Sequence, residues 1–363
     1  MSIQDKIGIK EAIHKKIVER KALDTTEAYA AMRDILLGNA TPAQVGAFLV
    51  ALKVHEPGVE EVTSLVRCMK DFANKIHPIN VHPVVDTCGT GGDALKTINI
   101  STLAALVAAG AGVTIAKHGN RSVTSACGSA DILEHLGVNI MASPATVEQS
   151  INNVGIGFMF APVFHPAMKH AAGPRKEIGL RTVFNVLGPL TNPAGATGQV
   201  LGVYDENLAT LMANALMAAG VKRFFIVHNE HGADELLPAG KNHVHEGMRN
   251  GTVKELVLGA RDFGLPEASL SDLVVSNLKE AGVQVFIDIL KNSGPGALVD
   301  AVLMNSALAI IAGGLVPDFK EATRLARASL ESGAALGKLR QLVKESGGSI
   351  DRFERRLGGT VAT

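Results

Sequence analysis

From residue 82 onward the chain alternates short apolar strands with helical segments. Val84 and Val85 lead into a loop, residues 102–109 have a helical pattern, and residues 113–116 have the pattern of a strand. Further strands are expected at 155–160, 199–204 and 224–228, with helices at 130–136 and 208–219. Strands joined through helices favour a mostly parallel sheet covered by helices. The larger part of the chain is therefore predicted to be α/β.

The first 75 or so residues show no strand pattern and predict consecutive helices. Asp24 and Glu27 have capping-box spacing, Gly38 ends that helix, and Thr41 precedes a proline at the start of the next. Residues 166–185 are also helical in pattern, so we expect a discontinuous helical domain. The predicted division is residues 1–77 with about 164–196 for the small all-helical domain, and 78–163 with about 197–363 for the α/β domain.

Composition excludes several classes of protein. Lys plus Arg and Asp plus Glu are both 35, so the chain has no excess positive charge for coating nucleic acid. Cys68, Cys88 and Cys127 are too widely spaced to indicate a disulfide framework or a zinc site. We expect reduced thiols and, because no signal-peptide pattern is present, a cytoplasmic location. The apolar stretches 98–116 and 301–316 contain polar residues and are expected to be buried, not membrane-spanning.

A glycine-rich segment, Gly89-Thr90-Gly91-Gly92-Asp93, follows a buried strand and precedes a helix. Backbone N–H groups in such a loop can bind phosphate, although the segment lacks both the Walker lysine and the dinucleotide-binding spacing. The segment Asn99-Ile100-Ser101-Thr102 places polar groups at the start of the next helix, where the helix dipole favours an anion. Taken alone, each segment favours the structural alternative, a tight turn for the first and an ordinary helix cap for the second.

A cationic segment, Lys117-His118-Gly119-Asn120-Arg121-Ser122, follows the next predicted strand. Parallel strands end at the same edge of a sheet, so this segment should lie near the glycine-rich loop. Lysine as a point charge and arginine as a forked donor suit a multiply phosphorylated ligand, whereas the structural alternative is a solvated loop. Ser125 and the segment Gly128-Ser129-Ala130-Asp131 add small residues before another helix.

Asp234 and Glu235 lie in a loop after the strand that ends at His228. Two carboxylates beside a phosphate repel it unless a cation lies between them, and Mg²⁺ coordinated by carboxylates, phosphate oxygens and water is the natural choice. Without the neighbouring motifs, the same pair would be interpreted as a surface acidic pair.

Five segments, in this order along the chain, resemble the anthranilate phosphoribosyltransferase family. They are residues 86–93, 99–102, 116–121, 128–131 and 181–193, and the similarity spans nearly the whole chain. The resemblance implies a Mg²⁺-dependent pentosyltransferase, in which anthranilate displaces pyrophosphate from 5-phosphoribosyl 1-pyrophosphate in the second step of tryptophan synthesis from chorismate. It also implies a homodimer, with no nucleic-acid or membrane partner.

The resemblance also assigns residues to each ligand. For phosphoribosyl pyrophosphate it implies Gly89, Gly92, Asp93, Thr97, Asn99, Ser101, Thr102, Lys117, His118, Gly119, Asn120, Arg121, Ser122, Ser125 and Ser129. For anthranilate it implies Gly89, Asn120 and Arg175, and for Mg²⁺ it implies Ser101, Asp234 and Glu235. Arg175 can pair with the anthranilate carboxylate through two hydrogen bonds. His118 is a candidate general base, with a structural histidine as the alternative.

Three departures from the family pattern limit these assignments. Ala94 stands where a glycine is common, the run 236–250 differs, and Cys88 and Cys127 flank binding segments although neither is given a catalytic role. Two other functions stay open at this point. One is a pyrimidine nucleoside phosphorylase, which also acts at a ribosyl anomeric carbon, and the other is a non-catalytic relative that binds nucleic acid.

Overall fold

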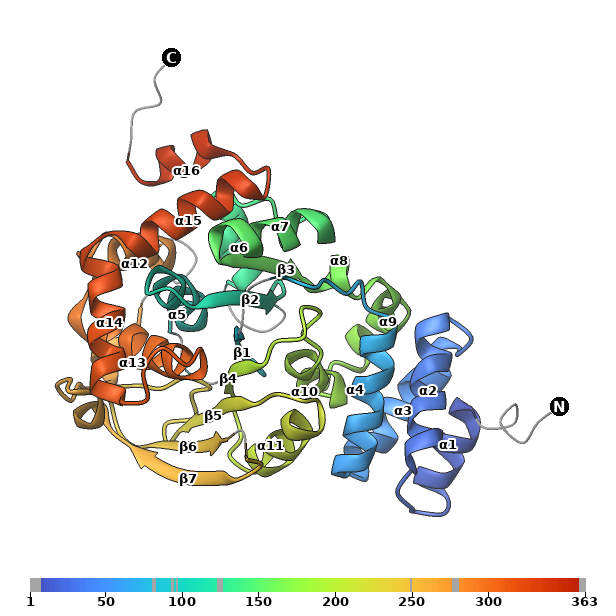
Figure 1. Ribbon diagram of the computed structural model, residues 1–363. Helices are drawn as coiled ribbons and strands as arrows, with labels where there is room; N and C mark the ends of the chain where they lie inside the picture. Colours follow the sequence, from blue (N-terminus) through green and yellow to red (C-terminus); the bar gives the residue numbers. More distant parts are fainter. Residues whose placement is uncertain are drawn as a thin grey trace.

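The computed structural model describes residues 8–79, 83–92, 95, 97–122, 127–248, 250–275 and 281–358. A bundle of helices lies beside a larger part built on one seven-stranded sheet (Figure 1). Within these ranges no helix has both the length and the apolar character needed to cross a bilayer. The apolar stretch predicted to be buried at 301–316 lies largely in α13 (Gly296–Ala312), whose side chains from Ala301 to Ala312 are all buried.

The amino-terminal part of the chain folds into consecutive helices, and the predicted limits of the second and the predicted start of the third are confirmed. They are α1 (Ile9–Ile17), α2 (Thr25–Leu37), α3 (Pro42–Val54) and α4 (Val59–Asp71). The Asp24 carboxylate accepts the N–H groups of Thr26 and Glu27, and Glu27 Oε2 accepts the Asp24 N–H at 2.8 Å. Gly38 ends α2 at φ +74°, a conformation that glycine adopts without steric cost. The predicted capping box and helix end are therefore confirmed.

The sheet has the order β3-β2-β1-β4-β5-β6-β7. Its strands are β1 (Val84–Gly89), β2 (Thr114–Gly119), β3 (Ile156–Phe160), β4 (Gly198–Gly202), β5 (Arg223–Asn229), β6 (Asn242–Gly247) and β7 (Val253–Leu258). β1 to β5 pair in parallel, which confirms the predicted mostly parallel sheet, whereas β5, β6 and β7 pair antiparallel. Gly89 pairs with Gly202 and Gly119 with Phe160, so the carboxyl ends of these four strands meet at one edge.

Helices cover both faces of the sheet at its central strands, whereas the edge strand β7 is partly exposed. Phe225 and Val227 pack into the core that contains α5 and α13, whereas Phe224 and Ile226 face α11 and the helical bundle. The remaining helices of this part are α5 (Ile100–Gly110), α6 (Ser129–His135), α7 (Pro144–Val154), α11 (Leu208–Ala218), α12 (Ala281–Leu290), α14 (Phe319–Glu331), α15 (Ala334–Glu345) and α16 (Ile350–Arg356), with 3₁₀ turns η3 (Ala260–Phe263) and η4 (Leu270–Leu273).

After β3 the chain returns to the helical bundle. This segment forms α8 (Ala161–Phe164), η2 (Pro166–Met168), α9 (Lys169–Ile178) and α10 (Val183–Leu190). Ala171 and Leu187 share one apolar core with Phe48 and Leu65 of the amino-terminal helices. This packing supports the discontinuous helical domain of residues 1–77 and about 164–196, whose boundaries stay a proposal.

Candidate functional site

The glycine-rich loop turns sharply at the end of β1. Thr90 N–H donates to the Gly202 carbonyl at 2.9 Å, and Gly91 and Gly92 adopt φ values of +66° and +81°. Side chains rarely tolerate this left-handed conformation, so the turn depends on glycine at both positions. Two predicted ligand residues, Asp93 and Ser125, lie outside the described ranges.

Asp234 reaches the glycine-rich loop, and Glu235 reaches the first turn of α5. Asp234 Oδ2 accepts the Gly91 N–H at 2.9 Å, and Glu235 Oε1 accepts the Ser101 N–H at 3.0 Å. A Cβ atom at Gly89 or at Gly202 would overlap Asp234, so glycine at both strand ends makes room for this acidic residue. The structure thus brings together the glycine-rich loop, Ser101 and the acidic pair, as the sequence predicts.

The donor set at this point suits a hard divalent cation. Asp234 is buried, and burial raises the pKa of its carboxyl group, so a cation beside it would offset the cost of its charge. Within the described ranges no three His, Cys, Asp or Glu side chains form a metal cluster. An ion here would therefore take the Asp234 and Glu235 carboxylates and the Ser101 hydroxyl, with ligand phosphate and water completing the shell, which is the usual Mg²⁺ pattern.

Lys117, His118 and Gly119 lie in β2, so the prediction that the cationic segment begins after this strand is wrong for these three residues. Lys117 is 3% exposed, and its Nζ donates to the Thr87 carbonyl at 2.5 Å and to Ser101 Oγ at 3.4 Å. Burial lowers the pKa of Lys117. The strand continues because residues 117–119 pair with 158–160 of β3, which the sequence of β2 alone does not reveal. The buried Lys117 side chain therefore helps to position the Ser101 hydroxyl.

Asp86 and Asn192 organise this edge of the sheet, and neither was predicted as a site residue. Asp86 accepts the His118 N–H at 3.1 Å and the Asn192 side-chain amide at 2.7 Å. The same amide donates to the Ala116 carbonyl at 2.9 Å. Burial raises the pKa of Asp86 to about 6. A carboxylate inside an otherwise apolar strand was the available sequence signal for Asp86.

The loop after β2 is held by α6. Asp131 Oδ2 accepts the N–H groups of Ser122 and Gly128 at 3.0 and 2.9 Å. Arg121 pairs with Asp131 at 2.9 Å and with Glu134 at 2.7 Å, and the hydrogen bonds to Glu134 and then Asp131 raise its pKa. The guanidinium of Arg121 is thus engaged on α6, and no contact within the described residues joins it to the glycine-rich loop.

Two contacts hold the other predicted residues of this loop. Ser129 Oγ donates to the Asn120 carbonyl at 3.3 Å. The Asn99 side-chain amide, at the start of α5, donates to the Cys127 carbonyl at 3.0 Å. The start of α5 is therefore joined both to the acidic pair and to Cys127, which lies just before α6. Thr102 lies in the first turn of α5, and its buried hydroxyl has no hydrogen-bond partner within the described residues.

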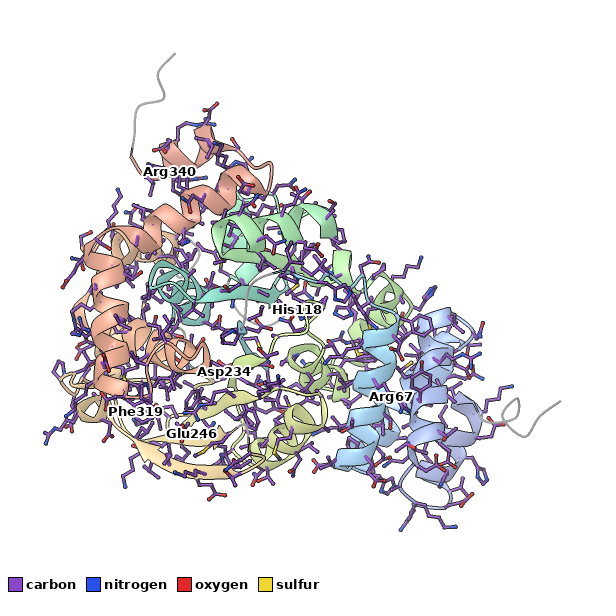
Figure 2. All side chains as sticks on the ribbon, viewed as in Figure 1. Arg67, His118, Asp234, Glu246, Phe319 and Arg340 are labelled. Carbon is purple, nitrogen blue, oxygen red and sulfur yellow. The ribbon has the colours of Figure 1, made fainter. Side chains whose placement is uncertain are left out.

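His118 is a poor general base in this environment. Burial lowers the pKa of His118 to about 3, and that of His165, whose ring centroid is 5.1 Å away, to about 4. The Nε2 atoms of both rings are buried without a hydrogen-bond partner among the described residues. Both rings are uncharged at neutral pH and can exchange only hydrogen bonds with a ligand. Figure 2 shows His118 and Asp234 in the central part of the molecule.

Arg175 projects from α9 and stacks on the Phe184 ring, with its guanidinium carbon 5.1 Å from the ring centroid. The side chain is half-buried, burial lowers its pKa, and no carboxylate of the described residues pairs with it. A partly desolvated guanidinium without a carboxylate suits a ligand carboxylate. No contact within the described structure joins Arg175 to Gly89 or Asn120, so the grouping of these three residues stays a prediction.

Arg181 is a further residue that the sequence reasoning missed. It precedes α10, donates from Nη2 to the Gly92 carbonyl, and stacks at 4.0 Å on the ring of Tyr204. Its positive charge acts to lower the pKa of Asp234, against the larger effect of burial. Its position inside the quoted 181–193 segment was the only sequence signal.

The three cysteines form no disulfide, as predicted. Burial raises the pKa of Cys68 to about 12 and that of Cys127 to about 11, and it also raises that of Cys88. Thiols in such environments are poor nucleophiles at neutral pH.

The two parts of the fold match two family models. The helical bundle domain of a glycosyl transferase family matches residues 10–73, and the a/b domain of the same family matches residues 81–336. Fold and site thus define a glycosyltransferase of the pentosyltransferase class.

A relative in Acetivibrio thermocellus, an anthranilate phosphoribosyltransferase, is 48% identical over 93% of this chain and 96% of its own. One in Pelotomaculum thermopropionicum is 47% identical over 93% and 97%. The chain belongs to the anthranilate phosphoribosyltransferase family.

Solved structures agree with this assignment. The anthranilate phosphoribosyltransferase of Thermus thermophilus is 42% identical, with a TM-score of 0.86 over 93% of this chain and 99% of its own. That of Saccharomyces cerevisiae, in complex with PRPP and Mg, is 29% identical, with a TM-score of 0.83 over 93% and 98%. The same yeast enzyme has also been solved with 4-fluoroanthranilate. These relatives favour the phosphoribosyltransferase over the nucleoside phosphorylase or nucleic-acid-binding alternatives.

Proposed function

We propose that this chain transfers the 5-phosphoribosyl group of 5-phosphoribosyl 1-pyrophosphate to the amine of anthranilate and releases pyrophosphate. The observation that carries the proposal is the convergence of Asp234 and Glu235 on Gly91 and Ser101, at 2.9 and 3.0 Å. That arrangement combines a glycine-rich loop, a helix amino terminus and two carboxylates at one sheet edge. The relatives named above carry this activity in their names.

Departure of pyrophosphate is the difficult step, since further negative charge develops, as the ribosyl C–O bond breaks, on a group that already carries several negative charges. The backbone N–H groups of the glycine-rich loop and the first turn of α5 are fixed donors for these charges. Lys117 Nζ donates to Ser101 Oγ at 3.4 Å, so the Ser101 hydroxyl is oriented before substrate binds. Mg²⁺ held by Ser101, Asp234 and Glu235 would neutralise charge on the leaving pyrophosphate.

The amine of anthranilate is neutral at pH 7, so its lone pair can attack without a strong base. His118 and His165 offer uncharged ring nitrogens that orient a ligand and do not abstract a proton, consistent with a His118 pKa of about 3. Arg175 would pair with the anthranilate carboxylate and hold the amine toward the anomeric carbon. Asn120 and Gly89 would complete that side of the cleft, as the family resemblance implies.

A single assay tests the proposal. The chain is incubated with phosphoribosyl pyrophosphate, Mg²⁺ and anthranilate, and loss of anthranilate fluorescence is followed, with pyrophosphate release as a second readout. We expect equal rates of anthranilate loss and pyrophosphate release, both abolished by a chelator and restored by Mg²⁺. Turnover of thymidine with inorganic phosphate, or full activity in the chelator, would refute it.

We further propose a homodimer formed through the helical bundle. The bundle carries exposed apolar side chains: Ile17, Val18, Leu37 and Val54 at the carboxyl ends of α1, α2 and α3, Val50 within α3, and Leu180 after α9. Val54 is 68% exposed, and covering such side chains favours association. Light scattering of the native chain and of Val54→Asp should give a dimer and a monomer, respectively, and a monomeric native chain would contradict the proposal. A cytoplasmic location stays a prediction, supported by the three unpaired thiols.

A further inference from the structure

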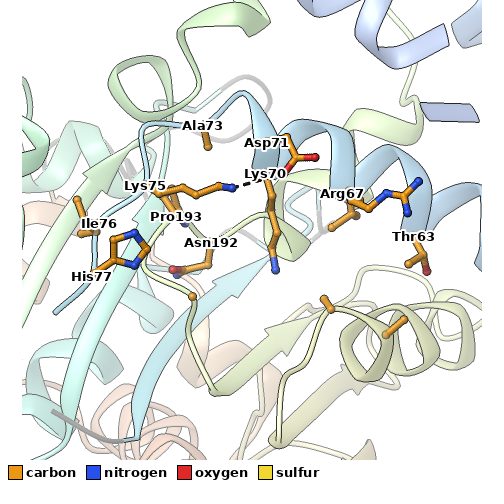
Figure 3. Close-up of a pocket in the computed structure, with 14 residues that line it drawn as sticks. Thr63, Arg67, Lys70, Asp71, Ala73, Lys75, Ile76, His77, Asn192 and Pro193 are labelled. Atoms are coloured by element: carbon orange, nitrogen blue, oxygen red, sulfur yellow. Dashed lines mark hydrogen bonds and ion pairs between the residues drawn. The ribbon is translucent and has the colours of Figure 1, made fainter. Parts of the chain in front are cut away.

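A cavity of about 360 Å³ lies away from the proposed reaction site, between α4, the carboxyl end of α11 and the 192–195 loop (Figure 3). Its volume is in the range of small-molecule sites. Its walls include the apolar residues Val66, Ile76, Pro193 and Ala218. None of the predicted substrate or metal residues lines it.

Positive side chains dominate the polar lining of this cavity. Arg67, Lys70 and Lys75 contribute cations, against the single carboxylate of Asp71. Lys75 pairs with Asp71 at 3.4 Å, and Arg67 stacks on the Tyr29 ring at 5.1 Å. The Lys70 ammonium group has neither an ion pair nor a hydrogen bond with any residue in the described ranges. Figure 3 shows its side chain running from α4 toward the opposite wall, away from the Lys75–Asp71 pair.

The cavity favours a monoanion over a phosphate dianion. Two helices, α4 and α11, present their carboxyl ends to it, at Asp71 and Ala218. The partial negative charge at these helix ends opposes a doubly charged anion, and neither helix offers its amino-terminal N–H groups. Lys70 is partly desolvated, and burial followed by the charge of Lys75 lowers its pKa, so an anion beside it would regain favourable interactions. The apolar walls of the cavity would then contact the non-polar part of the same ligand.

The cavity is also connected to the sheet edge. Asn192 lines it, and the same side-chain amide donates to Asp86 at 2.7 Å. Asp86 in turn accepts the His118 N–H at 3.1 Å at the end of β2. In addition, Ile76 N–H donates to the Pro193 carbonyl at 3.2 Å, so two chain segments that pass between the helical bundle and the sheet meet at the cavity. An occupant would therefore touch the network that positions β2.

We propose that this cavity binds a small amphipathic carboxylate, with Lys70 as its counter-ion, and that occupancy stabilises the Asn192–Asp86–His118 network. Binding in this cavity is separate from the proposed phosphoribosyl transfer. Its tests do not measure turnover, so either proposal can be refuted without the other.

Phenylacetate is a suitable probe, and phenylacetamide is the uncharged control of similar shape. Calorimetric titration of the full chain should give binding of phenylacetate at least about tenfold tighter than that of phenylacetamide. Lys70→Met should weaken phenylacetate binding by at least about tenfold. Lys344→Met is the matched control, because Lys344 likewise lies in the last turn of a helix, α15, but is exposed and does not line the cavity. It should leave the affinity unchanged.

Phenylacetate could instead occupy the proposed anthranilate position, and Arg175→Ala separates the two sites. Binding that is lost in Arg175→Ala and retained in Lys70→Met would overturn the proposal, as would equal affinity for the acid and the amide. The network is tested by hydrogen exchange: phenylacetate should slow exchange in residues 114–119 of the native chain and not in Lys70→Met. Binding without that protection would overturn the coupling of the cavity to the sheet edge.

Discussion

Replacing Asp234 by asparagine separates the role of its charge from its role in folding. The asparagine Oδ1 can still accept the Gly91 N–H that Asp234 accepts at 2.9 Å, so the glycine-rich loop keeps its support. Exchanging a charge-assisted hydrogen bond for a neutral one costs about 1 kcal/mol. Removing a buried charge, whose burial raises the pKa of Asp234, acts in the opposite direction. The free energy of unfolding should therefore change by less than about 1 kcal/mol.

This change converts to a small shift in melting temperature. At about 2.1 cal/mol/K per residue, a chain of 363 residues has an unfolding entropy of roughly 0.8 kcal/mol/K, so about 1 kcal/mol corresponds to roughly 1–2 °C. Activity should fall much further, by about 100-fold or more, because a group that fixes the cation beside the leaving pyrophosphate is lost.

The assay pairs scanning calorimetry without metal with initial rates at saturating Mg²⁺. Asp205→Asn is the control, because Asp205 lies in the loop before α11 and accepts only local hydrogen bonds from Asn207. It should leave both readouts unchanged. The reasoning is refuted if Asp234→Asn keeps more than about a tenth of the native rate, or if its melting temperature falls by much more than the roughly 1–2 °C expected.

Three further outcomes are expected. Arg175→Ala should raise the KM for anthranilate by about 10- to 100-fold, corresponding to about 1.5–3 kcal/mol for a charged hydrogen bond, with little change in the KM for phosphoribosyl pyrophosphate; equal effects on both would argue against its role. Glu61→Gln should destabilise the chain by about 3–5 kcal/mol in urea unfolding, because Glu61 and Lys16 form a buried ion pair at 2.9 Å; a loss below about 1 kcal/mol would contradict this. Asp86 has a folded-state pKa of about 6, above its usual 3.8, so the folded state binds its proton more tightly. Its contribution to stability is therefore full below about pH 4 and is lost as the pH rises to about 6, by up to about 3 kcal/mol relative to Asp86→Asn; a pH-independent difference between the two chains would refute it.

Local signals in the sequence predict most of the fold. The caps of α2 and α3 and the strand–helix alternation depend on nearby residues, and the structure confirms them. The antiparallel hairpin of β6 and β7 was not predicted, and β6 lies in the run that departs from the family pattern. In β6, His243 and His245 alternate with buried residues. His245 is mostly buried because β6 pairs with both β5 and β7, and the sequence of β6 alone does not display this pairing.

The site was predictable in its composition and less so in its geometry. Glycines and the acidic pair could be recognised because backbone conformation and charge repulsion restrict the residues that fit. The burial of Lys117 could not be recognised, because it depends on pairing with β3, about 40 residues later. The engagement of Arg121 by Glu134 likewise depends on how α6 packs after the loop. Residues that act through contacts distant in sequence, such as Asn192 on Asp86, are visible only in three dimensions.

The shared core of the amino-terminal helices and α10 has a consequence for synthesis on the ribosome. Apolar side chains such as Phe48 and Leu65 are covered in part by Leu187, which is translated more than a hundred residues after α4 ends. At about 5–20 residues per second, those faces stay uncovered on the nascent chain for on the order of ten seconds. The first helices to be made therefore complete their packing only after α10 has been synthesised, and during that interval they present apolar surface of the kind that chaperones bind.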